Sequence, residues 1–541
     1  MTTMQPQQRY QQAIQTFRAG HHAESAQHCQ QLLQLQPKHP DVLHLLGLNL
    51  QALQQPQDAA RMFKFVLQQQ ANHKGAQKSL IGLYNRLGLQ EDALPLATQL
   101  VKQHSNDPEA VFLQAQTLRD LGHFSQALQL IEPLRQQLPQ AWPLLDYLYA
   151  GVLHDLDRYA DAEQVLLALL AAQPEYIDAH TTLNKLYWEQ GPQEKFMDSI
   201  RTALTQLPQS RALHYCYAVH FLIAERYDDC RAAVEHALTL FPSAAEFVHL
   251  LGSTFAREGA NDQAMQQYLR ALDLQPNSDR YQLDVANLLI KAGDYQRALT
   301  HLDKAEQLAP DNQEMWAYKG LCYRLLNDPR SQWLDDYDGF VQALPIDVPP
   351  EYPSRETFID AVVAALDGLH KSAQQPLDQS VRNGTQTVGY LFQQQHPAIQ
   401  QYKQMLERAT QRYLKSLPKD AKHPFLRRKQ QQFRFTGAWS VKLKESGFHT
   451  NHVHPKGWLS CCSYLKVPSN VQPDDPQRQG WIKFGETSMQ LGEREHIAKA
   501  VCPQAGYVVF FPSYFWHGTV PFAGDEVRMT LPVDIAPHLI G

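Results

Sequence analysis

Three histidines near the C-terminal end of the chain have the spacing of metal ligands. An aromatic and β-branched stretch predicts a strand that leads into Gly-Phe-His-Thr-Asn-His-Val-His-Pro at 447–455. Because side chains alternate faces along a strand, His452 and His454 are expected to point the same way, and His449 falls on the opposite parity. Two imidazoles on one face can take adjacent positions around a metal ion, and His517 is the candidate for a third ligand.

The sequence around these histidines has the pattern of a β-rich domain. Short apolar runs alternate with Gly and Pro turns, which predicts strands at 433–444, 458–467, 480–484, 506–511, 516–520 and 526–535. This spacing favours a β-sandwich or barrel, with helices at 355–372 and 399–417 before it. In such a fold His517 follows one strand and a Pro turn, and Arg528 lies eleven residues later on the next strand.

The first 325 residues repeat with a period of 34, with a single step of 35. Proline recurs at this step, and two further series with the same step consist mostly of small residues. The three series run from Pro37 to Pro310, from Ala59 to Ala298 and from Gly47 to Gly320, with Pro139 and Phe196 among their members. Self-similarity at this period indicates a solenoid of paired amphipathic helices, such as 42–53 and 57–69.

This periodic pattern resembles tetratricopeptide repeats. It covers residues 5–326 as about nine repeats, with one more helix at 312–326 that would cap the stack. A superhelix of this kind has a concave groove, which suits a protein or peptide substrate held in an extended form. The alternative is a spacer or an oligomerisation scaffold with an empty groove. The predicted helix faces are rich in Gln, which disfavours a cationic clamp for a terminal carboxylate.

The C-terminal sequence, from about residue 350 to the end, resembles the 2-oxoglutarate/Fe(II) oxygenases. The resemblance rests on the order of His452, His517 and Arg528 and on the phrases at 457–465, 506–512 and 517–521. It is greatest to the prolyl-hydroxylase-related branch and to bacterial oxygenases that join tetratricopeptide repeats to this domain. The phrase at 378–387 is also typical of that group, and a first core strand is its simplest interpretation. The resemblance implies a multidomain chain with an α-solenoid followed by a double-stranded β-helix, or jelly roll.

The same resemblance assigns the metal ligands. His452 matches the family's first ligand and His517 its distal ligand, so these two residues and His454 are the expected Fe(II) ligands at the catalytic centre. His454 stands where the family usually has a carboxylate. It either ligates the metal, which strand parity favours, or lies behind the ligands while water completes the site. Three neutral imidazoles would leave the iron more positive by one charge than two imidazoles and a carboxylate.

The resemblance also implies a site for the cosubstrate. Arg528 matches the arginine that holds the distal carboxylate of 2-oxoglutarate, where a planar guanidinium suits bidentate binding. Tyr464 matches a tyrosine that assists it, and Thr530 shares strand parity with Arg528. Taken singly, an Arg on a strand is usually an ion-pair partner and a Tyr usually belongs to a core. The interpretation therefore depends on the whole set in its order and spacing.

A 2-oxoglutarate- and Fe(II)-dependent dioxygenase is the activity that the resemblance implies. Such a hydroxylase consumes 2-oxoglutarate and O2, releases succinate and inserts hydroxyl into a substrate C–H bond. With the repeats beside it, the expected substrate is a side chain of a polypeptide that the repeats recruit. One alternative is a repeat-based interaction scaffold with a lapsed oxygenase domain. Another is a small-molecule oxygenase whose repeats serve assembly.

Length, charge and cysteines narrow the other expectations. A chain of 541 residues exceeds a single core, and the Pro-rich segment 327–353 is the expected linker before an oxygenase domain at 354–541. The net charge of −6 predicts no nucleic acid partner. The chain has no apolar run of ~20 residues for a membrane span and no apolar signal-peptide core at its start. The seven cysteines have no Cys-x-x-Cys spacing and are expected to be reduced thiols in a cytoplasmic protein. The sequence does not predict the oligomeric state.

Overall fold

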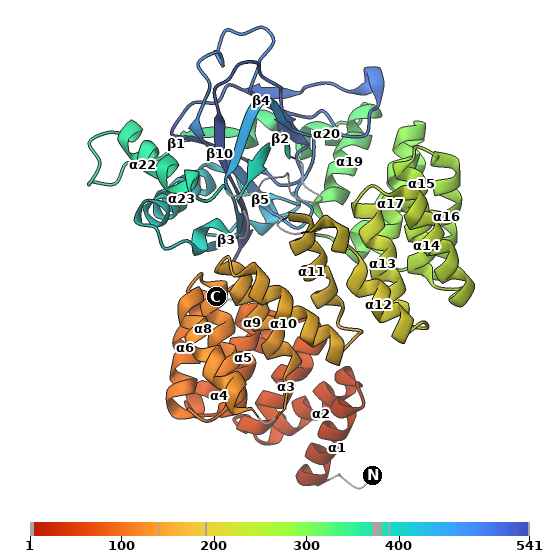
Figure 1. The fold of residues 1–541 in the computed structure, drawn as a ribbon, viewed down its shortest axis with the longest axis vertical. Helices are drawn as coiled ribbons and strands as arrows, with labels where there is room; N and C mark the ends of the chain where they lie inside the picture. The colour runs from red at the N-terminus through yellow and green to blue at the C-terminus, as the bar shows by residue number, and fades with distance from the viewer. Residues whose placement is uncertain (1–4, 139, 190–191, 371–380, 388–389, 539–541) are drawn as a thin grey trace. The chain divides into compact units, whose positions relative to one another are not determined.

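The computed structural model of the protein describes residues 5–138, 140–189, 192–370, 381–387 and 390–538. The chain divides into two compact units, which can be followed by colour in Figure 1. Unit 1 comprises residues 1–165 together with 538–541, and unit 2 comprises residues 166–537. Among the sequence features above, Pro139 and residues 378–380 lie outside the described residues.

Unit 1 is built from paired helices of nearly equal length. They are α1 (Pro6–Arg18), α2 (His22–Leu35), α3 (Pro40–Ala52), α4 (Pro56–Gln69), α5 (Lys74–Arg86), α6 (Gln90–Gln103), α7 (Pro108–Asp120), α8 (Phe124–Gln137), α9 (Pro143–Asp155) and α10 (Tyr159–Ala172), which ends beyond residue 165. Small residues recur where two helices of a pair touch. A Cβ on Gly47 of α3 would lie only 2.5 Å from Cε1 of Phe63 on α4, so the packing of this pair requires glycine there.

The repeats continue into unit 2. Their helices are α11 (Ile177–Glu189), α12 (Asp198–Gln206), α13 (Arg211–Ile223), α14 (Tyr227–Leu240), α15 (Ala245–Arg257), α16 (Asn261–Leu274), α17 (Asp279–Ala292), α18 (Tyr295–Leu308) and α19 (Gln313–Leu325). The pair α11/α12 is irregular, because Met197 has a positive φ of 75° and α12 begins only after it. Phe196 occupies the position of a small residue in this repeat. The irregular pairing of α11 and α12 explains why a bulky residue is tolerated there. Within the described residues, α1–α18 form nine consecutive pairs, and α19 is one additional helix.

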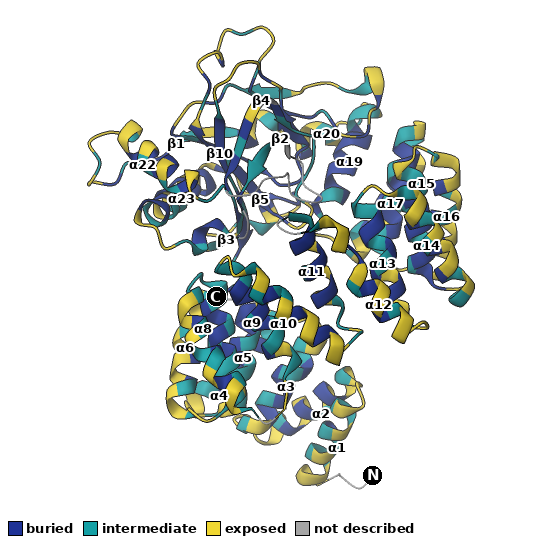
Figure 2. Cartoon of the chain, in the orientation of Figure 1, coloured by how far each residue is buried: buried dark blue, intermediate teal, exposed yellow. Residues whose placement is uncertain are grey.

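The last repeat helix, α19, is buried on nearly all sides (Figure 2). A single hydrophobic cluster extends from Ala245 in the repeats to Ile535 in the C-terminal sheet, and it includes Met315, Trp316 and Leu321 of α19. This helix therefore does not end the solenoid against solvent, because the C-terminal domain covers it. The final repeats and that domain share one core.

The C-terminal domain contains two antiparallel sheets. The larger has the order β1–β8–β5–β10–β4–β2, with β3 also paired to β10, and the smaller has the order β7–β6–β9. The strands are β1 (Gln342–Pro345), β2 (Val381–Gln386), β3 (Phe433–Ala438), β4 (Val441–His449), β5 (Leu459–Lys466), β6 (Ile482–Phe484), β7 (Lys499–Val501), β8 (Tyr507–Pro512), β9 (His517–Thr519) and β10 (Arg528–Pro537). This is the β-rich jelly-roll architecture that the sequence predicted. The expected strand 433–444 is divided into β3 and β4, and β2 confirms a strand in the described part of 378–387.

Helices α22 (Arg355–Asp367) and α23 (Pro397–Ser416) pack on the larger sheet, where the rings of Tyr413 and Phe510 stack at 4.9 Å. The segment expected to be a linker is structured. It contains α20 (Arg330–Leu334), α21 (Tyr337–Phe340) and β1, which pairs with β8. Pro345 is tolerated because β1 is an edge strand and Pro345 is its last residue. A domain boundary within 327–353 stays a proposal based on where the repeat period ends.

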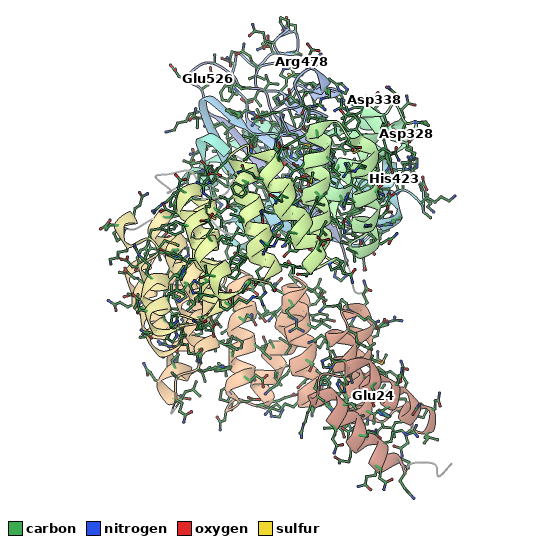
Figure 3. The ribbon with its side chains drawn as sticks, turned by 90° about the vertical axis from the view of Figure 1, so that its right-hand side faces the viewer. Glu24, Asp328, Asp338, His423, Arg478 and Glu526 are labelled. Carbon is green, nitrogen blue, oxygen red and sulfur yellow. The ribbon has the colours of Figure 1, made fainter. Side chains whose placement is uncertain are left out.

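Among the residues labelled in Figure 3, Glu24, Asp338, Arg478 and Glu526 are exposed, whereas His423 is buried. Asp338 is almost fully exposed and accepts a hydrogen bond from Nζ of Lys499 at 2.8 Å. Asp328 forms an ion pair with Arg330 at 2.6 Å. None of the helices in the described ranges is both long and apolar enough to cross a membrane.

Candidate active site

The structure brings His452, His454 and His517 together. One ligand nitrogen from each lies within 4.8 Å of those of the other two. His452 and His517 also exchange backbone hydrogen bonds, N to O, at 3.0 and 3.1 Å. The backbone N–H of His454 donates to the carbonyl of Ser513 at 2.9 Å. Strand β4 ends at His449, so these backbone contacts, and not strand alternation, align the first two histidines.

In each of the three histidines, Nδ1 is engaged by an oxygen atom. Nδ1 of His452 contacts the carbonyl of Thr450 at 2.7 Å, and Nδ1 of His517 contacts that of Phe515 at 2.9 Å. A carbonyl can only accept, so Nδ1 carries the proton in each neutral ring and Nε2 keeps its lone pair. Burial lowers the pKa of His452 to about 4 and holds the pKa of His517 well below its usual range. Both side chains are therefore neutral and ready to ligate a cation at neutral pH.

His454 differs because its Nδ1 contacts a carboxylate oxygen, Oδ1 of Asp534, at 2.5 Å. The hydroxyl of Ser460 donates to the same oxygen at 2.8 Å. Burial disfavours the charged form of both partners, but their attraction outweighs it. The pKa of His454 is therefore raised and that of Asp534 is lowered. A carboxylate behind a ligating histidine orients the ring and makes it a stronger donor.

Sequence reasoning did not single out Asp534. The available signal was strand parity, since residues 528, 530 and 534 of β10 lie on one face of the sheet. His449 lies at the end of β4 with its ring 6.0 Å from that of His452, and it lines the same cavity without joining the cluster. Burial lowers its pKa strongly.

The three histidines open into a cavity of about 770 Å³ that Tyr464 and Arg528 also line. Arg528 is only 1% exposed, and its Cζ lies 5.1 Å from the centre of the Tyr464 ring. Thr530 is fully buried and pairs in register with Tyr464 across the sheet. The structure therefore brings together the three residues expected to hold the cosubstrate.

These three residues carry polar atoms that the protein leaves unsatisfied. Nε of Arg528 and the hydroxyl groups of Tyr464 and Thr530 are buried and make no hydrogen bond of ordinary geometry. The Tyr464 hydroxyl lies near the Arg528 guanidinium and the Cys462 thiol, and its pKa is raised well above the usual range, mainly by burial. Buried polar groups nearly always have partners, so a cluster of donors without them fits a bound carboxylate.

The donor set also fits a resident metal ion. Three imidazole nitrogens suit Fe(II) as well as Zn(II), Cu(II) or Ni(II). They leave other coordination positions for a cosubstrate and O2. The histidines alone therefore indicate a transition metal, and its identity has to come from the family to which the domain is similar.

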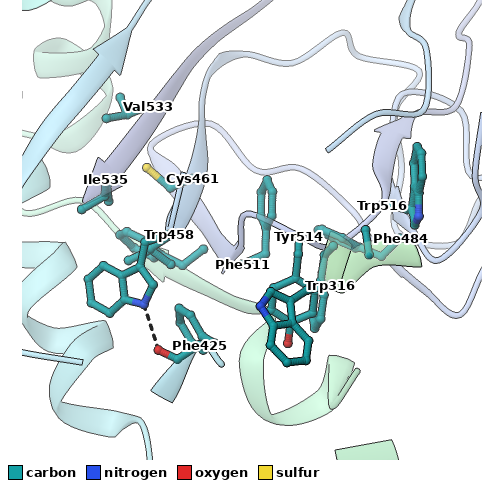
Figure 4. Packing of buried hydrophobic residues seen from close by; sticks show 14 of the residues in the cluster. Trp316, Phe425, Trp458, Cys461, Phe484, Phe511, Tyr514, Trp516, Val533 and Ile535 are labelled. Atoms are coloured by element: carbon teal, nitrogen blue, oxygen red, sulfur yellow. Dashed lines mark hydrogen bonds between the residues drawn. The ribbon is translucent and has the colours of Figure 1, made fainter. Parts of the chain in front are cut away.

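Helix α19 contacts both segments that carry the three histidines. The backbone N–H of Gln313 donates to the carbonyl of Pro455, next to His454, at 3.0 Å. The ring of Tyr318 stacks on Trp516, next to His517, with centroids 6.2 Å apart and an interplanar angle of 11°. Figure 4 shows Trp316 of α19 among the buried aromatic residues of this core. The last repeat therefore supports both segments that carry the histidines.

Comparison with protein families identifies both parts of the chain. Residues 437–534, which include all three histidines, Arg528 and Asp534, match the family described as "Putative 2OG-Fe(II) oxygenase". The tetratricopeptide repeat family matches 44–108, 193–279 and 283–332, and residues 87–169 match "Anaphase-promoting complex, cyclosome, subunit 3". The chain thus has N-terminal tetratricopeptide repeats and a C-terminal domain that matches the model of the 2OG-Fe(II) oxygenase family.

Two individual proteins are similar to parts of the chain. Cellulose synthase operon protein C of Pseudomonas fluorescens (strain SBW25) is 26% identical over 303 residues, which are 54% of this chain and 22% of that protein. The chain therefore spans about a fifth of that curated relative. The crystal structure of a tetratricopeptide repeat protein from Parabacteroides merdae aligns with 14% identity and a TM-score of 0.35, over 53% of this chain and 98% of that one.

Proposed function

We propose that this chain, with its tetratricopeptide repeats and its 2OG-Fe(II) oxygenase domain, is a dioxygenase that hydroxylates a side chain of a polypeptide. The observation that carries the proposal is the pairing of two unsatisfied clusters in one cavity. One ring nitrogen of each of three histidines lies within 4.8 Å of those of the other two. Arg528 and Tyr464 line the same cavity, and buried donor atoms of Arg528, Tyr464 and Thr530 make no hydrogen bond of ordinary geometry. A metal ion and the distal carboxylate of 2-oxoglutarate would satisfy both clusters.

Each of these groups has a distinct role in the proposed reaction. His452, His454 and His517 would hold Fe(II) through the ring nitrogens that remain, since their Nδ1 atoms are bonded to the protein. Arg528 binds the distal carboxylate of 2-oxoglutarate, with the two hydroxyl groups as further donors. When bound, Fe(II) and 2-oxoglutarate supply O2-dependent oxidation of a C–H bond, in which 2-oxoglutarate and O2 become succinate, CO2 and the substrate hydroxyl.

Succinate release by the purified full-length chain tests the catalytic part of the proposal. With Fe(II), O2 and 2-oxoglutarate supplied, we expect slow succinate formation even without substrate, and we expect His517→Ala to abolish it together with bound iron. His449→Gln is the matched control, because this histidine lines the cavity outside the cluster and its variant should keep the iron. Normal iron binding by His517→Ala would refute the site.

The repeats support the polypeptide part of the proposal. Tetratricopeptide repeats generally mediate protein–protein interaction. The last of them packs against the oxygenase domain through α19. A test starts from proteins crosslinked to the inactive His517→Ala variant. Purified candidates are then incubated with the wild-type chain and examined by mass spectrometry for the gain of one oxygen atom. A gain that depends on 2-oxoglutarate is the expected result, and oxidation only of free amino acids would favour a small-molecule enzyme.

A further inference from the structure

The cavity has a second cationic end that the reaction described above does not use. Arg434 and Thr436 of β3 both line the cavity. Phe433 precedes Arg434 on the strand, and Phe435 lies between Arg434 and Thr436. Both phenylalanines pack against the hydrophobic core. The strand thus alternates apolar and polar residues, and its polar side faces the space that the three histidines share.

The Arg434 side chain is half-buried and has no carboxylate partner among the described residues. Its Nε is buried without a hydrogen bond, and in the described ranges no carboxylate forms an ion pair with it. Burial lowers its pKa, but a guanidinium stays charged in proteins. A half-buried charge without a partner has lost part of its hydration, and a ligand that brings a negative charge to it would offset that loss.

Arg434 and Arg528 lie at opposite ends of the cavity wall. In the register of β10, Arg434 pairs with Ala536, two residues beyond Asp534, whereas Arg528 opens the same strand. Eight residues of extended chain separate the two positions by roughly 25 Å. Asp534, which holds His454, lies between them and nearer to Arg434. One carboxylate bound at Arg528 therefore cannot also satisfy Arg434.

The charges that line the cavity favour an anionic ligand at this end. Arg434, Lys456 and Arg528 are its non-histidine cations, and Asp534 is the sole carboxylate among its described lining residues. Asp534 is already engaged by His454 and Ser460. A divalent metal and the dianion of 2-oxoglutarate cancel one another, so the cavity retains an excess of positive charge when both are bound.

We infer that Arg434 binds a carboxylate of the substrate, so that the enzyme selects a polypeptide with an acidic group close to the carbon that is hydroxylated. The inference rests on the proposed function for the meaning of substrate. The carboxylate can belong to an Asp or Glu side chain or to the C-terminus of a chain. A planar guanidinium with a free edge suits either source.

Small blocked probes test this inference on the full-length chain. Under anaerobic conditions with Fe(II) and 2-oxoglutarate bound, N-acetyl-aspartate amide is titrated beside its neutral isostere, N-acetyl-asparagine amide, by calorimetry. We expect the acid to bind at least about tenfold more tightly, because a charge-assisted contact is added. N-acetylalanine and its amide form a second pair, which distinguishes a terminal carboxylate from a side-chain carboxylate.

Variants of Arg434 test whether this residue causes the preference for the acid over the amide. Arg434→Gln should abolish the advantage of the acid, and Arg434→Lys should keep part of it. Arg412→Gln, on α23 with Asp347 as its partner, should keep all of it. Arg434→Gln should also unfold at the same or a higher temperature than the wild type, since an uncompensated charge is removed. A lower unfolding temperature would instead assign Arg434 a structural role and would count against the inference.

Three results would overturn the inference. The first is equal affinity for acid and amide in the wild type, including no detectable binding of either. The second is an unchanged preference in Arg434→Gln. The third is a loss of 2-oxoglutarate affinity in that variant, which would make Arg434 part of the cosubstrate site. Failure of the wild type to take up Fe(II) or 2-oxoglutarate would refute the proposed function instead, and the acid–amide comparison would still decide the role of Arg434 in the metal-free chain.

Discussion

The resemblance places His454 where 2-oxoglutarate/Fe(II) oxygenases usually have a carboxylate ligand, and in this chain the carboxylate of Asp534 lies against the His454 ring. Asp534 contacts Nδ1 of His454 at 2.5 Å, and both side chains are only partly exposed. A negative charge at this distance partly offsets the extra positive charge of a centre with three imidazoles. The pair gives a physical reason why a histidine can serve at that position.

The first prediction concerns Asp534. Asp534→Asn keeps the shape of the side chain and removes its charge, so we expect the affinity for a divalent metal to fall by about 10- to 100-fold. Competition against a chelating dye measures that affinity without any need for turnover. Asp347→Asn is the control, since its carboxylate pairs with Arg412 far along the chain from the histidines. Metal affinity in Asp534→Asn equal to the wild type would show that the carboxylate only fills space.

A second prediction concerns Arg528. Removing a buried, bidentate, charge-assisted contact costs about 1.5–3 kcal/mol. Arg528→Ala should therefore weaken 2-oxoglutarate binding at least tenfold while metal binding is retained. Arg528→Lys should be intermediate, because an ammonium is a point charge without the planar fork. Calorimetric titration with 2-oxoglutarate measures the difference, and an unchanged dissociation constant would mean that another cation holds the distal carboxylate.

At the scale of single residues, the sequence predicted which site residues lie together better than it predicted the side chains that contact them. His452, His454 and His517, and separately Arg528, Tyr464 and Thr530, lie together as expected, while their functional roles stay predictions. Asp534 was missed because a lone Asp on a strand has no pattern of its own. Its meaning appears only when His454, 80 residues earlier, is brought against it by folding.

At the scale of elements, helix α19 joins the repeats to the oxygenase domain. Its N-terminal residue Gln313 is bonded to the segment that carries His454, and its Tyr318 stacks beside the segment that carries His517. Arg494 adds a second connection, since it donates to the hydroxyl of Tyr295 at 2.8 Å and to the carbonyl of Lys291 at 3.2 Å. The geometry of the histidines therefore depends on repeats that precede them by more than a hundred residues.

This dependence leads to a third prediction. Tyr318→Ala removes a ring that is only 4% exposed, and loss of a buried aromatic side chain typically costs about 3–5 kcal/mol. We expect weaker metal binding and faster hydrogen exchange at 513–519 than in the wild type. Tyr318→Phe is the matched control, because it keeps the stacked ring and loses only the hydroxyl bonds to Asn287 and Glu314. Equal metal affinity in Ala and Phe variants would mean that the stacking does not support the site.

Regular elements were predicted from the sequence more accurately than irregular ones. The repeat helices and the strands of the jelly roll follow from apolar periods that are local in the chain. Strand β1 was missed because Pro345 and its neighbours read as breakers, although an edge strand can end on proline. The shortened helix at α12 follows a residue with positive φ, Met197, which carries no signal in the sequence.

On the scale of the whole molecule, the repeats cannot be removed as one block. The hydrophobic cluster of unit 2 continues from α15 and α16 into the sheet, so a truncation at residue 325 would cut through a shared core. A truncated chain could lose activity because it misfolds or because it no longer recruits the substrate, and the activity measurement would not distinguish the two causes. Tests of recruitment are better made by varying the substrate.

A fourth prediction therefore concerns the length of the substrate. If repeats and oxygenase domain act on one polypeptide, a segment held by the repeats raises the effective concentration of its target residue at the metal. Peptides that carry only the modified residue should bind poorly, and longer ones should recover both affinity and turnover. The measurement is succinate released per hydroxyl formed across a series of lengths. Free amino acids or tripeptides as good as any protein would exclude this arrangement.

Direct chelation of 2-oxoglutarate by Fe(II) at the three histidines can be followed without a substrate. An anaerobic titration of the full-length chain with Fe(II) and then 2-oxoglutarate should produce a visible charge-transfer band, which glutarate, lacking the oxo group, should not produce. We predict that Arg528→Ala forms the band only at higher 2-oxoglutarate concentration and that His517→Ala does not form it at all. An iron-loaded wild type without the band, or a band of full strength in His517→Ala, would contradict the assignment of this site.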